Sequence, residues 1–473
     1  MTPNVAPPRP LSPPLTPGAA GFRQESRGAG RNIIVFFCIA LIFIRFSMIH
    51  QLIAYMFRVN LYLLYLFGIP AILAVFLSGG VLRVLRYRTA IYWVLFVLWV
   101  LIDIPFSTWR GGSAQMAYSY LRTEFPVLFI VGGLAINRRE CRLVLQTVAA
   151  ACVVNLFVSS SFSQVDSNAR MSLLQIGSVS NANDFAGHLI LVLPFLLWVA
   201  LSAKTVLIRF LSVAGLAWGT YLIMASASRG AAIAVAVAVV FMVVSAPGRL
   251  RLVFLLTAPL VVFLAVFLIP RHALQRILSF SSTTENASEE ALESSQIRER
   301  LFLDSVKDTI AHPLFGVGPG QFSENEGKER LSVNGPGLWY QTHNSLTQIA
   351  SECGIPALIL YLLAIGSAFQ LLGRNGRRVR GVPQLADLGN AIFCMRLSMV
   401  AFGTAILFLN FGYVFYLLAM SGIAIILDLA ITDALGGSAP TPAVSAGLNF
   451  QPLPRPGRRS LPHLDNRIAG PKI

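Results

Sequence analysis

The feature that most constrains this chain is a succession of apolar segments between residues 32 and 430, each about as long as a helix that crosses a membrane. Only 12% of the 473 residues are charged, whereas soluble globular chains carry about 25%. So little charge cannot solvate the surface of a soluble body of this size, which excludes an ordinary soluble enzyme, a disordered protein and a coiled coil. We therefore predict an all-α, polytopic membrane protein whose apolar exterior is covered by lipid.

The apolar segments predict about twelve transmembrane helices, or eleven, because the first two pairs of segments are poorly separated. Their expected bounds are 32–52, 60–79, 90–106, 115–135, 143–162, 183–203, 210–227, 230–246, 252–270, 343–369, 388–409 and 411–430. The chain then divides into a Pro-rich tail at 1–31, nine transmembrane helices in 32–270, a polar loop at 271–342, three transmembrane helices in 343–430 and a second tail at 431–473. We expect the first tail to stay extended or disordered, because its composition cannot form a core.

The net charge of +16 predicts the sidedness of the chain. Cytoplasmic loops of membrane proteins are enriched in Lys and Arg. If the N-terminus lies inside, most of the 37 Lys and Arg residues fall in inner segments, while the short outer loops hold Arg58, Arg110 and Arg170, with Arg229 at the edge of a span. We therefore predict that both termini are cytoplasmic and that the basic charge orients the chain in the membrane rather than binding nucleic acid.

The predicted outer loop at 271–342 is the only long polar stretch between the tails. It holds seven basic and ten acidic residues, so it is acidic although the whole chain is basic. Residues 297–311 predict an amphipathic helix that ends at His312-Pro313. Arg298 and Arg300 lie about 200° apart on such a helix, so at most one of them can face a given ligand. A loop of this length is usually functional.

Charged residues inside predicted spans are the first candidates for function, because burying charge in a membrane is costly. Most of them fall on the predicted outer side, which indicates a water-filled cavity that opens outward. The alternative is a set of internal ion pairs, for example of Arg122 with Glu124 or Asp103. Arg396, near an inner end, is expected to snorkel. The full set is Arg45, Asp103, Arg122, Glu124, Asp184, Arg229, Glu352 and Arg396.

Three further positions carry side chains suited to chemistry. Arg229 lies in a very short connection between two spans, where its fork of donors suits a phosphate or diphosphate, although an interfacial anchor is the alternative. His343 stands with Asn344 at the outer mouth of a span and can act as a base near neutral pH, although a lone His is often structural. Asn183-Asp184 opens a span and can cap it.

The sequence favours no metal and no nucleotide cofactor. Asp184 and His188 share a helix face, but two ligands without a third make a weak metal site, and the six His residues lack metal-ligand spacing. The glycine-rich turn at 316–320 lacks the Lys and Ser/Thr of a phosphate-binding loop and follows no strand.

The order of these motifs resembles the O-antigen ligase and polymerase family of bacterial envelopes. The similarity covers roughly residues 175–365, and the order and topology agree over the rest of the chain. It rests on Ser180-Asn181-Ala182-Asn183-Asp184, Ser228-Arg229-Gly230, Arg298, the run His312-Pro313-Leu314-Phe315-Gly316-Val317-Gly318-Pro319-Gly320-Gln321-Phe322, His343-Asn344-Ser345-Leu346 and Glu352-Cys353-Gly354-Ile355-Pro356. One departure is Phe302, where the family usually has Trp four residues after the arginine.

The resemblance implies a glycosyltransferase of the bacterial inner membrane, which moves a glycan from undecaprenyl diphosphate to an acceptor hydroxyl at the periplasmic face, without metal or nucleotide sugar. Carried over by motif, Arg229 and Arg298 would engage the donor diphosphate, and His343 would activate or position the acceptor hydroxyl. Arg122, Asp184 and Asn344 are further substrate-binding candidates. A single displacement aided by a base predicts inversion at the anomeric carbon.

The class of acceptor and two other functions stay open at this point. A ligase would attach finished glycan to lipopolysaccharide core or to protein, whereas a polymerase would use another lipid-linked repeat as acceptor. A transporter or flippase of lipid-linked glycan would need charged residues along its whole path, but here they gather on the outer side. A membrane scaffold with docking tails would explain the Pro-rich ends but not the order of the outer motifs.

Overall fold

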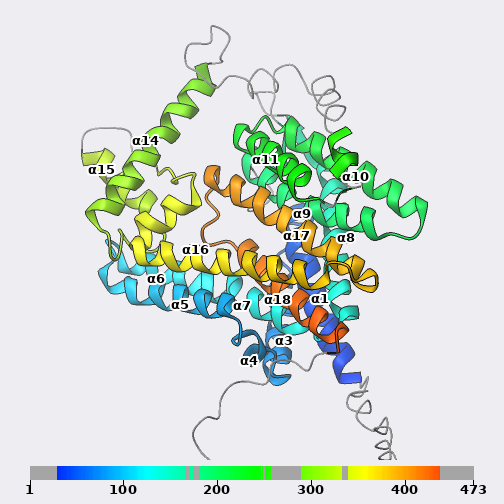
Figure 1. The fold of residues 1–473 in the computed structure, drawn as a ribbon. Helices are drawn as coiled ribbons and strands as arrows, with labels where there is room; N and C mark the ends of the chain where they lie inside the picture. The colour runs from blue at the N-terminus through cyan, green and yellow to red at the C-terminus, as the bar shows by residue number, and fades with distance from the viewer. Residues whose placement is uncertain are drawn as a thin grey trace, which may run out of the picture. The chain divides into compact units, whose positions relative to one another are not determined.

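The computed structural model describes residues 29–165, 171–173, 181–246, 248, 251–256, 289–332 and 339–436, which are almost entirely helical (Figure 1). The all-α prediction is confirmed. The two strands, β1 (Ser163–Val165) and β2 (Met171–Leu173), form a single short antiparallel pair that the sequence analysis does not predict. Residues 1–28 and 437–473 of the two tails and most of the predicted span at 252–270 lie outside the described residues.

The first half of the described chain forms helices α1 to α11. They are α1 (Ala29–Ser47), α2 (Ile49–Phe57), α3 (Leu63–Leu77), α4 (Gly80–Val84), α5 (Arg88–Asp103), η2 (Ile104–Phe106), α6 (Arg110–Ser119), η3 (Tyr120–Glu124), α7 (Pro126–Leu134), α8 (Arg138–Phe162), α9 (Ala182–Ser202), α10 (Val206–Ala225) and α11 (Arg229–Ser245). The second half forms α14 (Glu289–Ala311), α15 (Phe322–Ser332), α16 (Ser345–Val379), η5 (Pro383–Leu385), α17 (Ala386–Ala405), η6 (Ile406–Phe408) and α18 (Tyr416–Ala434).

Among the described residues, seven helices are long and apolar enough to cross a membrane, and the bent pair α1–α2 would make an eighth. The seven are Arg88–Phe106, Arg138–Phe162, Ala182–Ser202, Val206–Ala225, Ser345–Val379, Pro383–Phe408 and Tyr416–Ala434. Two shorter apolar helices, Leu63–Leu77 and Arg229–Ser245, coincide with further predicted spans. The chain is polytopic as predicted, while the count of twelve stays a prediction.

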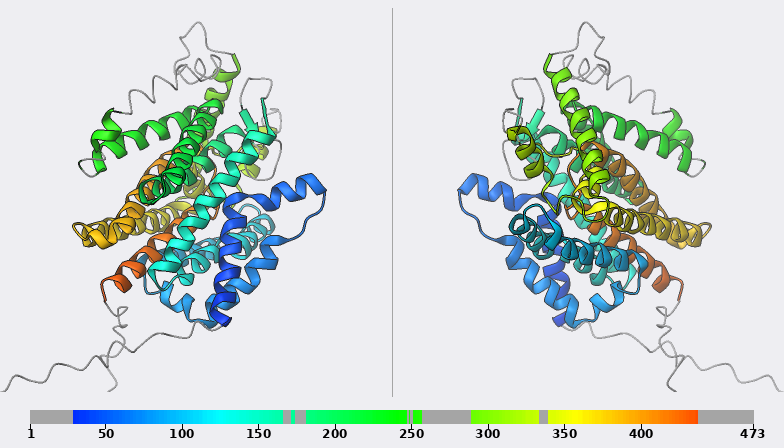
Figure 2. Two further views of the ribbon diagram at one scale, coloured as in Figure 1. Left: turned by 90° about the vertical axis from the view of Figure 1, so that its right-hand side faces the viewer. Right: turned by 90° about the vertical axis from the view of Figure 1, so that its left-hand side faces the viewer.

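Two predicted spans are interrupted by local backbone changes. The span at 32–52 is bent by 69° between α1 and α2, at Met48, whose φ of +54° is left-handed. As a result α2 has no buried residue and projects from the bundle (Figure 2). The span at 115–135 contains the π-helical turn η3, and the Thr123 carbonyl in this turn accepts a hydrogen bond from Arg45. Such turns open the backbone hydrogen-bond pattern of a helix.

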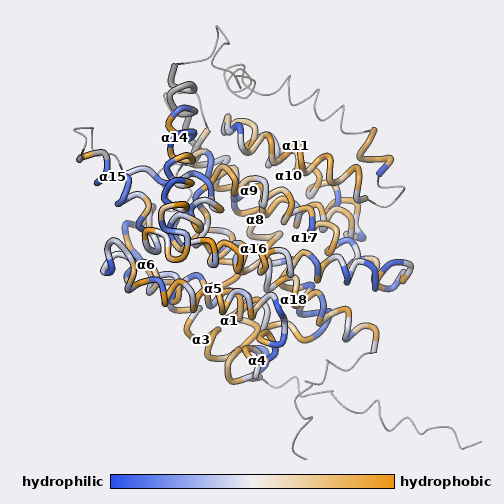
Figure 3. The backbone as a smooth tube through the Cα atoms, turned by 60° about the vertical axis from the view of Figure 1, so that its left-hand side comes forward, coloured by the Kyte–Doolittle hydropathy of each residue, from blue (hydrophilic) through white to orange (hydrophobic). Residues whose placement is uncertain are grey.

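The core lies around α18 and α9, which are buried along most of their lengths. α7 crosses α18 at Gly132 and Gly422, where a Cβ on Gly422 would lie 2.9 Å from the Gly132 backbone nitrogen. Small residues allow helices in a membrane to approach this closely. Apolar residues dominate these helices, whereas α14 and α15 are rich in hydrophilic residues (Figure 3). α14 packs against α16, and Leu301 of α14 is fully buried, whereas Leu303 and Ile310 are exposed.

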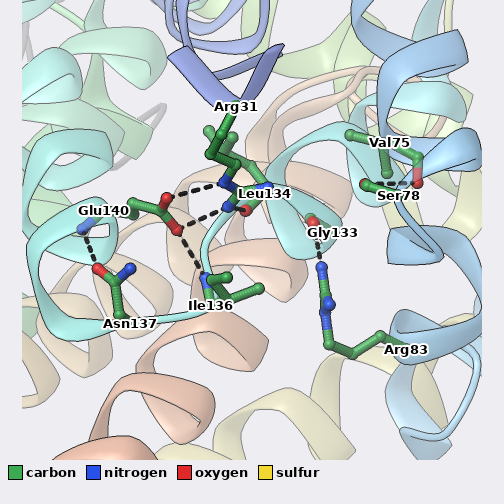
Figure 4. Close-up of polar contacts among 9 residues, drawn as sticks. All are labelled: Arg31, Val75, Ser78, Arg83, Gly133, Leu134, Ile136, Asn137 and Glu140. Atoms are coloured by element: carbon green, nitrogen blue, oxygen red, sulfur yellow. Dashed lines mark hydrogen bonds and ion pairs between the residues drawn. The ribbon is translucent and has the colours of Figure 1, made fainter. Parts of the chain in front are cut away.

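Basic residues that the sequence assigns to the inner side come together at one end of the bundle. Figure 4 shows Arg31 bound to the Glu140 carboxylate at 2.7 Å and to the Leu134 carbonyl at 2.6 Å. Arg83 donates to the Gly133 carbonyl at 2.8 Å beside this pair. Leu134 and Gly133 lie at the end of α7, so the two arginines satisfy carbonyl groups of this helix end and also stabilise the fold.

Two more carboxylates hold basic residues at the same end. Asp428 in α18 pairs with Arg374 at 3.3 Å and Arg378 at 3.0 Å, both near the end of α16. Asp387, at the start of α17, pairs with Arg138 at the start of α8. α14 and α15 lie at the other end, where α16 begins (Figure 1). These basic clusters and the helices α14 and α15 therefore lie at different ends of the bundle, while the sidedness of the two ends stays a prediction.

Candidate active site

A break in α16 organises the end of the bundle that carries α14. Gly354 has a φ of +78° and interrupts the helix, so nearby carbonyl groups lose their helical partners. The carbonyls of Ser351 and Glu352 instead accept hydrogen bonds from the backbone N–H groups of Val317 and Gly318, at 2.8 and 2.9 Å. The glycine-rich turn is thus docked on the break, and these backbone amides bind the protein itself rather than a phosphate.

Three more contacts secure the segment that follows α14. The Gly320 N–H donates to the buried Glu352 carboxylate at 3.0 Å, and the Ile355 N–H donates to the Pro313 carbonyl at 2.8 Å. The Phe315 ring stacks on Phe106 with their centroids 4.0 Å apart. Because these residues continue directly from α14, the contacts fix where α14 ends.

Arg298 and Arg300 have different surroundings on α14, as their spacing predicts. Arg298 is partly buried, and its positive charge acts on both Asp184 and His343. Arg300 is more exposed and lies 3.7 Å from the Asp304 carboxylate and 3.6 Å from the Glu326 carboxylate. Arg298 therefore belongs to the candidate site, and Arg300 links α14 to α15.

Arg229 is the first residue of α11, after the tight turn from α10. The turn passes through Ala227, whose φ of +51° is left-handed, and Ser228, whose side chain accepts a hydrogen bond from the Ala231 N–H at 3.4 Å and caps the helix. A Cβ on Gly230 would lie 2.6 Å from the Phe408 side chain, so only glycine lets α11 start this close to η6. The turn and its glycine hold Arg229 at a defined place, half-buried at the helix start.

His343 lies in the turn that enters α16, half-buried and with a left-handed φ of +53°. The next residue, Asn344, caps α16 by accepting hydrogen bonds from the N–H groups of Leu346 and Thr347 at 2.9 and 3.2 Å. Left-handed backbone at a residue other than glycine is strained and tends to occur at functional sites. This strain supports a role for His343 beyond packing.

Residues 408–411, which run from the end of η6 toward α18, bring the elements of these candidates together. The Ser345 hydroxyl at the start of α16 donates to the Leu409 carbonyl at 2.8 Å. A Cβ on Gly187, one turn after Asp184 in α9, would lie 2.3 Å from the Leu409 side chain. Gly230 of α11 faces Phe408 in the same way. One short segment therefore contacts the helices that carry Asp184, Arg229 and His343.

The electrostatics of His343 follow from this environment. Burial, and second the positive charge of Arg298, lower the pKa of His343 to about 4. Both causes disfavour the charged imidazolium. The ring is therefore neutral at pH 7, the form that a general base requires.

The other substrate-binding candidates are placed as follows. Asn181, not Asn183 or Asp184, caps α9, because its side chain accepts hydrogen bonds from both of their N–H groups at 2.8 and 3.0 Å. Its amide also donates to the Asp184 carboxylate at 2.8 Å, which holds that carboxylate beside the helix start. Arg122 lies in η3 over the rings of Tyr65 and Tyr118, 5.3 and 4.9 Å from their centroids. These are cation–π contacts.

The ion pair that forms near Arg122 differs from the expected pairs of Arg122 with Glu124 or Asp103. Glu124 pairs with Arg45 at 3.1 Å, and its second oxygen accepts a hydrogen bond from the Phe415 N–H at 3.0 Å. The Arg45 guanidinium lies 4.7 Å from the Phe415 ring centroid. This pair joins α1, η3 and the start of α18, so it stabilises the bundle beside the candidate site.

His188 is a structural residue of the core. Its Nε2 atom lies 2.7 Å from Asn155 and 3.1 Å from the Phe46 carbonyl, and its Nδ1 atom lies 2.9 Å from the Tyr416 hydroxyl. Both ring nitrogens are thus used within the protein, and the ring does not pair with Asp184 around a metal. Across the part of the chain that the structure describes, no group of three His, Cys, Asp or Glu side chains could hold a metal ion.

Sequence reasoning missed Asn410, which contacts the residues before His343. Its side chain bonds to Gln341 at 2.9 Å and to Thr342 at 3.1 Å. The available signal was its position, because Asn410 is the single residue between the predicted spans 388–409 and 411–430. Nothing in the sequence indicates its partners, which lie almost 70 residues earlier.

Comparison with known proteins agrees with the motifs. Residues 214–362 match the model of the family described as O-antigen ligase, a stretch that includes Arg229, Arg298 and His343. No curated protein matches the chain. The family match confirms the resemblance to the O-antigen ligase family and links the chain to glycan transfer in O-antigen or polysaccharide assembly.

Proposed function

We propose that this protein transfers a glycan from an undecaprenyl-diphosphate donor to an acceptor hydroxyl at the periplasmic face of the bacterial inner membrane. The observation that carries the proposal is the arrangement of the family motifs. The charge of Arg298 acts on Asp184 and His343, and residues 408–411 contact the helices of Asp184, Arg229 and His343. The acceptor is a glycan or a lipid-linked molecule, and both termini of the chain lie in the cytoplasm.

The two arginines supply the electrostatic part of the reaction. Negative charge builds on the diphosphate as the bond between its oxygen and the anomeric carbon breaks. Guanidinium groups of Arg229 and Arg298 stabilise that charge, and donors placed in advance are worth several kcal/mol in such sites. The diphosphate leaves with the electron pair of the broken bond, so the reaction needs neither a nucleotide sugar nor a metal.

His343 supplies the base. It removes the proton of the acceptor hydroxyl as the acceptor oxygen forms its bond to the anomeric carbon. A bound diphosphate brings negative charge next to Arg298, which raises the pKa of His343 from about 4 back toward its ordinary value. The base is therefore stronger when the donor is present. A single displacement inverts the anomeric carbon, and NMR of the product linkage tests this outcome.

The experiment is the envelope glycan profile of a deletion strain that expresses wild type, Arg229→Ala or His343→Ala at matched levels. Arg300→Ala is the matched control, since Arg300 pairs with Asp304 and Glu326 and is not among the groups that lower the pKa of His343. We expect both site variants to fail to restore the profile and the control to restore it. Long glycan that accumulates on the lipid carrier indicates a ligase, whereas glycan that stops at one repeat indicates a polymerase.

Normal profiles with both site variants would contradict the assignment of these residues. A flippase would move lipid-linked glycan without changing its length or attachment. If the site variants lost translocation but kept glycan transfer in broken membranes, the proposal that the protein is a transferase would be contradicted. The two failures are distinguishable because transfer in broken membranes needs no translocation.

A further inference from the structure

Asn410, which lies between η6 and α18 and outside the family motifs, contacts the residues that precede His343. Its Nδ2 atom donates to the Gln341 Oε1 atom at 2.9 Å. Its Oδ1 atom accepts a hydrogen bond from the Thr342 hydroxyl at 3.1 Å. One amide side chain therefore holds both residues that come immediately before His343.

This turn needs such support because its backbone is strained. The φ of His343 is +53°, and a left-handed backbone costs a residue other than glycine about 1–2 kcal/mol. The Thr342 hydroxyl oxygen also lies 3.1 Å from the Asn344 carbonyl oxygen, so its one proton is shared between this oxygen and Asn410, and it accepts a hydrogen bond from the Asn344 N–H at 3.5 Å. These contacts span His343 from one side to the other. Thr342 is buried, which keeps water from competing for these hydrogen bonds.

The segment that carries Asn410 is itself fixed on both sides. The Leu409 carbonyl accepts a hydrogen bond from Ser345, and the Phe411 N–H donates to the same hydroxyl, both at 2.8 Å. The Gly412 N–H donates to the Gln348 side chain at 3.1 Å. Asn410 therefore projects from a backbone that is tied to the first turns of α16, the helix that His343 precedes.

We propose that Asn410 is a positioning residue for His343, which holds the left-handed turn and thereby the direction of the imidazole toward the reacting hydroxyl. The inference rests on the proposed function, because it assumes that His343 acts as the base. It adds a residue outside the matched stretch 214–362 to the catalytic machinery. Asn410 does not touch substrate in this role and acts only through Thr342 and Gln341.

The loss of this support has a consequence that differs from general destabilisation. When the turn relaxes to a negative φ, the imidazole ring of His343 leaves its half-buried place and moves away from Arg298 on α14. The Arg298 charge is one of the two causes that lower the pKa of His343, and it also acts on Asp184 of α9. The pKa of His343 then moves from about 4 toward its ordinary value of 6.5. The base is protonated at a higher pH, so the acid limb of the rate profile moves upward.

The test uses membrane vesicles of the deletion strain, whose accumulated lipid-linked glycan serves as donor. The vesicles contain the full-length protein, either wild type or with one of the substitutions Asn410→Ala, Thr342→Val and Thr342→Ser. We expect Asn410→Ala and Thr342→Val to lower kcat by about 10- to 100-fold with KM changed less than about twofold, since small misplacements of catalytic groups cost up to about 100-fold. We expect Thr342→Ser, which keeps the hydroxyl, to stay near wild type. The double variant should lose little more than either single one, because both remove the same hydrogen bond.

Two readouts separate positioning from folding. The acid limb of kcat/KM, which reports the free enzyme, should move up in Asn410→Ala and Thr342→Val but not in Thr342→Ser. NMR titration of labelled His343 should show the same upward shift without any substrate. An unchanged pKa and kcat in both variants would overturn the inference.

Full activity of His343→Ala would instead show that the proposed function has the wrong base, so the two failures are distinguishable. If Asn410→Ala does not fold, the Thr342 pair decides alone.

Discussion

Arg298 and Arg300 carry the same charge two residues apart, yet only Arg298 is among the groups that lower the pKa of His343. We expect Arg298→Ala to lower glycan transfer by about 10²- to 10³-fold, as removal of one donor to a developing negative charge does. The pKa of His343 should also rise, because a neighbouring positive charge that disfavours the imidazolium is gone. Arg300→Ala is the control in the same vesicle assay, and we expect less than about a twofold loss of transfer, because Arg300 pairs with Asp304 and the buried Glu326 and is not among the groups that lower the pKa of His343. Equal losses in the two variants would contradict the assignment.

At this scale the sequence predicts residue type and helical face but not tertiary partners. The angular spacing of Arg298 and Arg300 was sufficient to predict that they differ in environment. The left-handed backbone of His343 has no sequence signal, because histidine normally adopts negative φ. Glu124 pairs with Arg45, almost 80 residues away, because the π-helical turn and the bend after α1 bring them together. Such contacts depend on the packing of helices that periodicity cannot orient.

At the scale of elements, the break in α16 determines how α14 meets the bundle. A Cβ on Gly354 would lie 2.1 Å from the Leu314 carbonyl oxygen, and its φ is +78°. We expect Gly354→Ala to destabilise the protein by about 3 kcal/mol or more, since overpacking costs about 1–3 kcal/mol and strained backbone adds about as much. Thermal unfolding in detergent measures the loss, and transfer activity should fall with it.

The matched control for this prediction lies in the same helix. A Cβ on Gly366 would have no neighbour within 4 Å, and its φ is helical. We expect Gly366→Ala to leave the Tm unchanged or to raise it slightly, because alanine is about 1 kcal/mol better than glycine inside a helix. If Gly354→Ala also left the Tm unchanged, the docking of the glycine-rich turn would not hold α14 in place.

The predicted spans show which elements hydropathy can find. Apolar length located α5, α8, α9, α10, α17 and α18 with small errors at the ends, whereas α16 continues to Val379, ten residues beyond the predicted span 343–369. It did not locate the break at Gly354, the bend at Met48 or the π-helical turn at 120–124. These features differ from a continuous helix in their backbone angles, which hydropathy does not report. The short pair β1–β2 has too few residues to produce a periodic signal.

For the whole molecule, the prediction concerns its direction in the membrane. Lys307 is exposed on α14, at the end where α16 begins, and Arg377 is exposed near the end of α16. From Gly354 to Arg377 the helix rises about 35 Å at 1.5 Å per residue, more than the roughly 30 Å of a bilayer core. We therefore predict that the two positions lie on opposite sides of the membrane, and the excess of arginine near Arg377 favours the cytoplasm for that side.

Cysteine labelling tests this direction directly, because all five native cysteines are buried. In spheroplasts, a maleimide that cannot cross membranes should label Lys307→Cys fully and leave Arg377→Cys unlabelled until the cells are permeabilised. Wild type, with its buried thiols, gives the background under both conditions. The opposite pattern would put the Arg298 and His343 end in the cytoplasm, where a donor that is presented at the periplasmic face cannot reach it. Labelling of both positions in intact spheroplasts would show that α16 does not cross the membrane, and the topology would then need a different assignment of its longest helix.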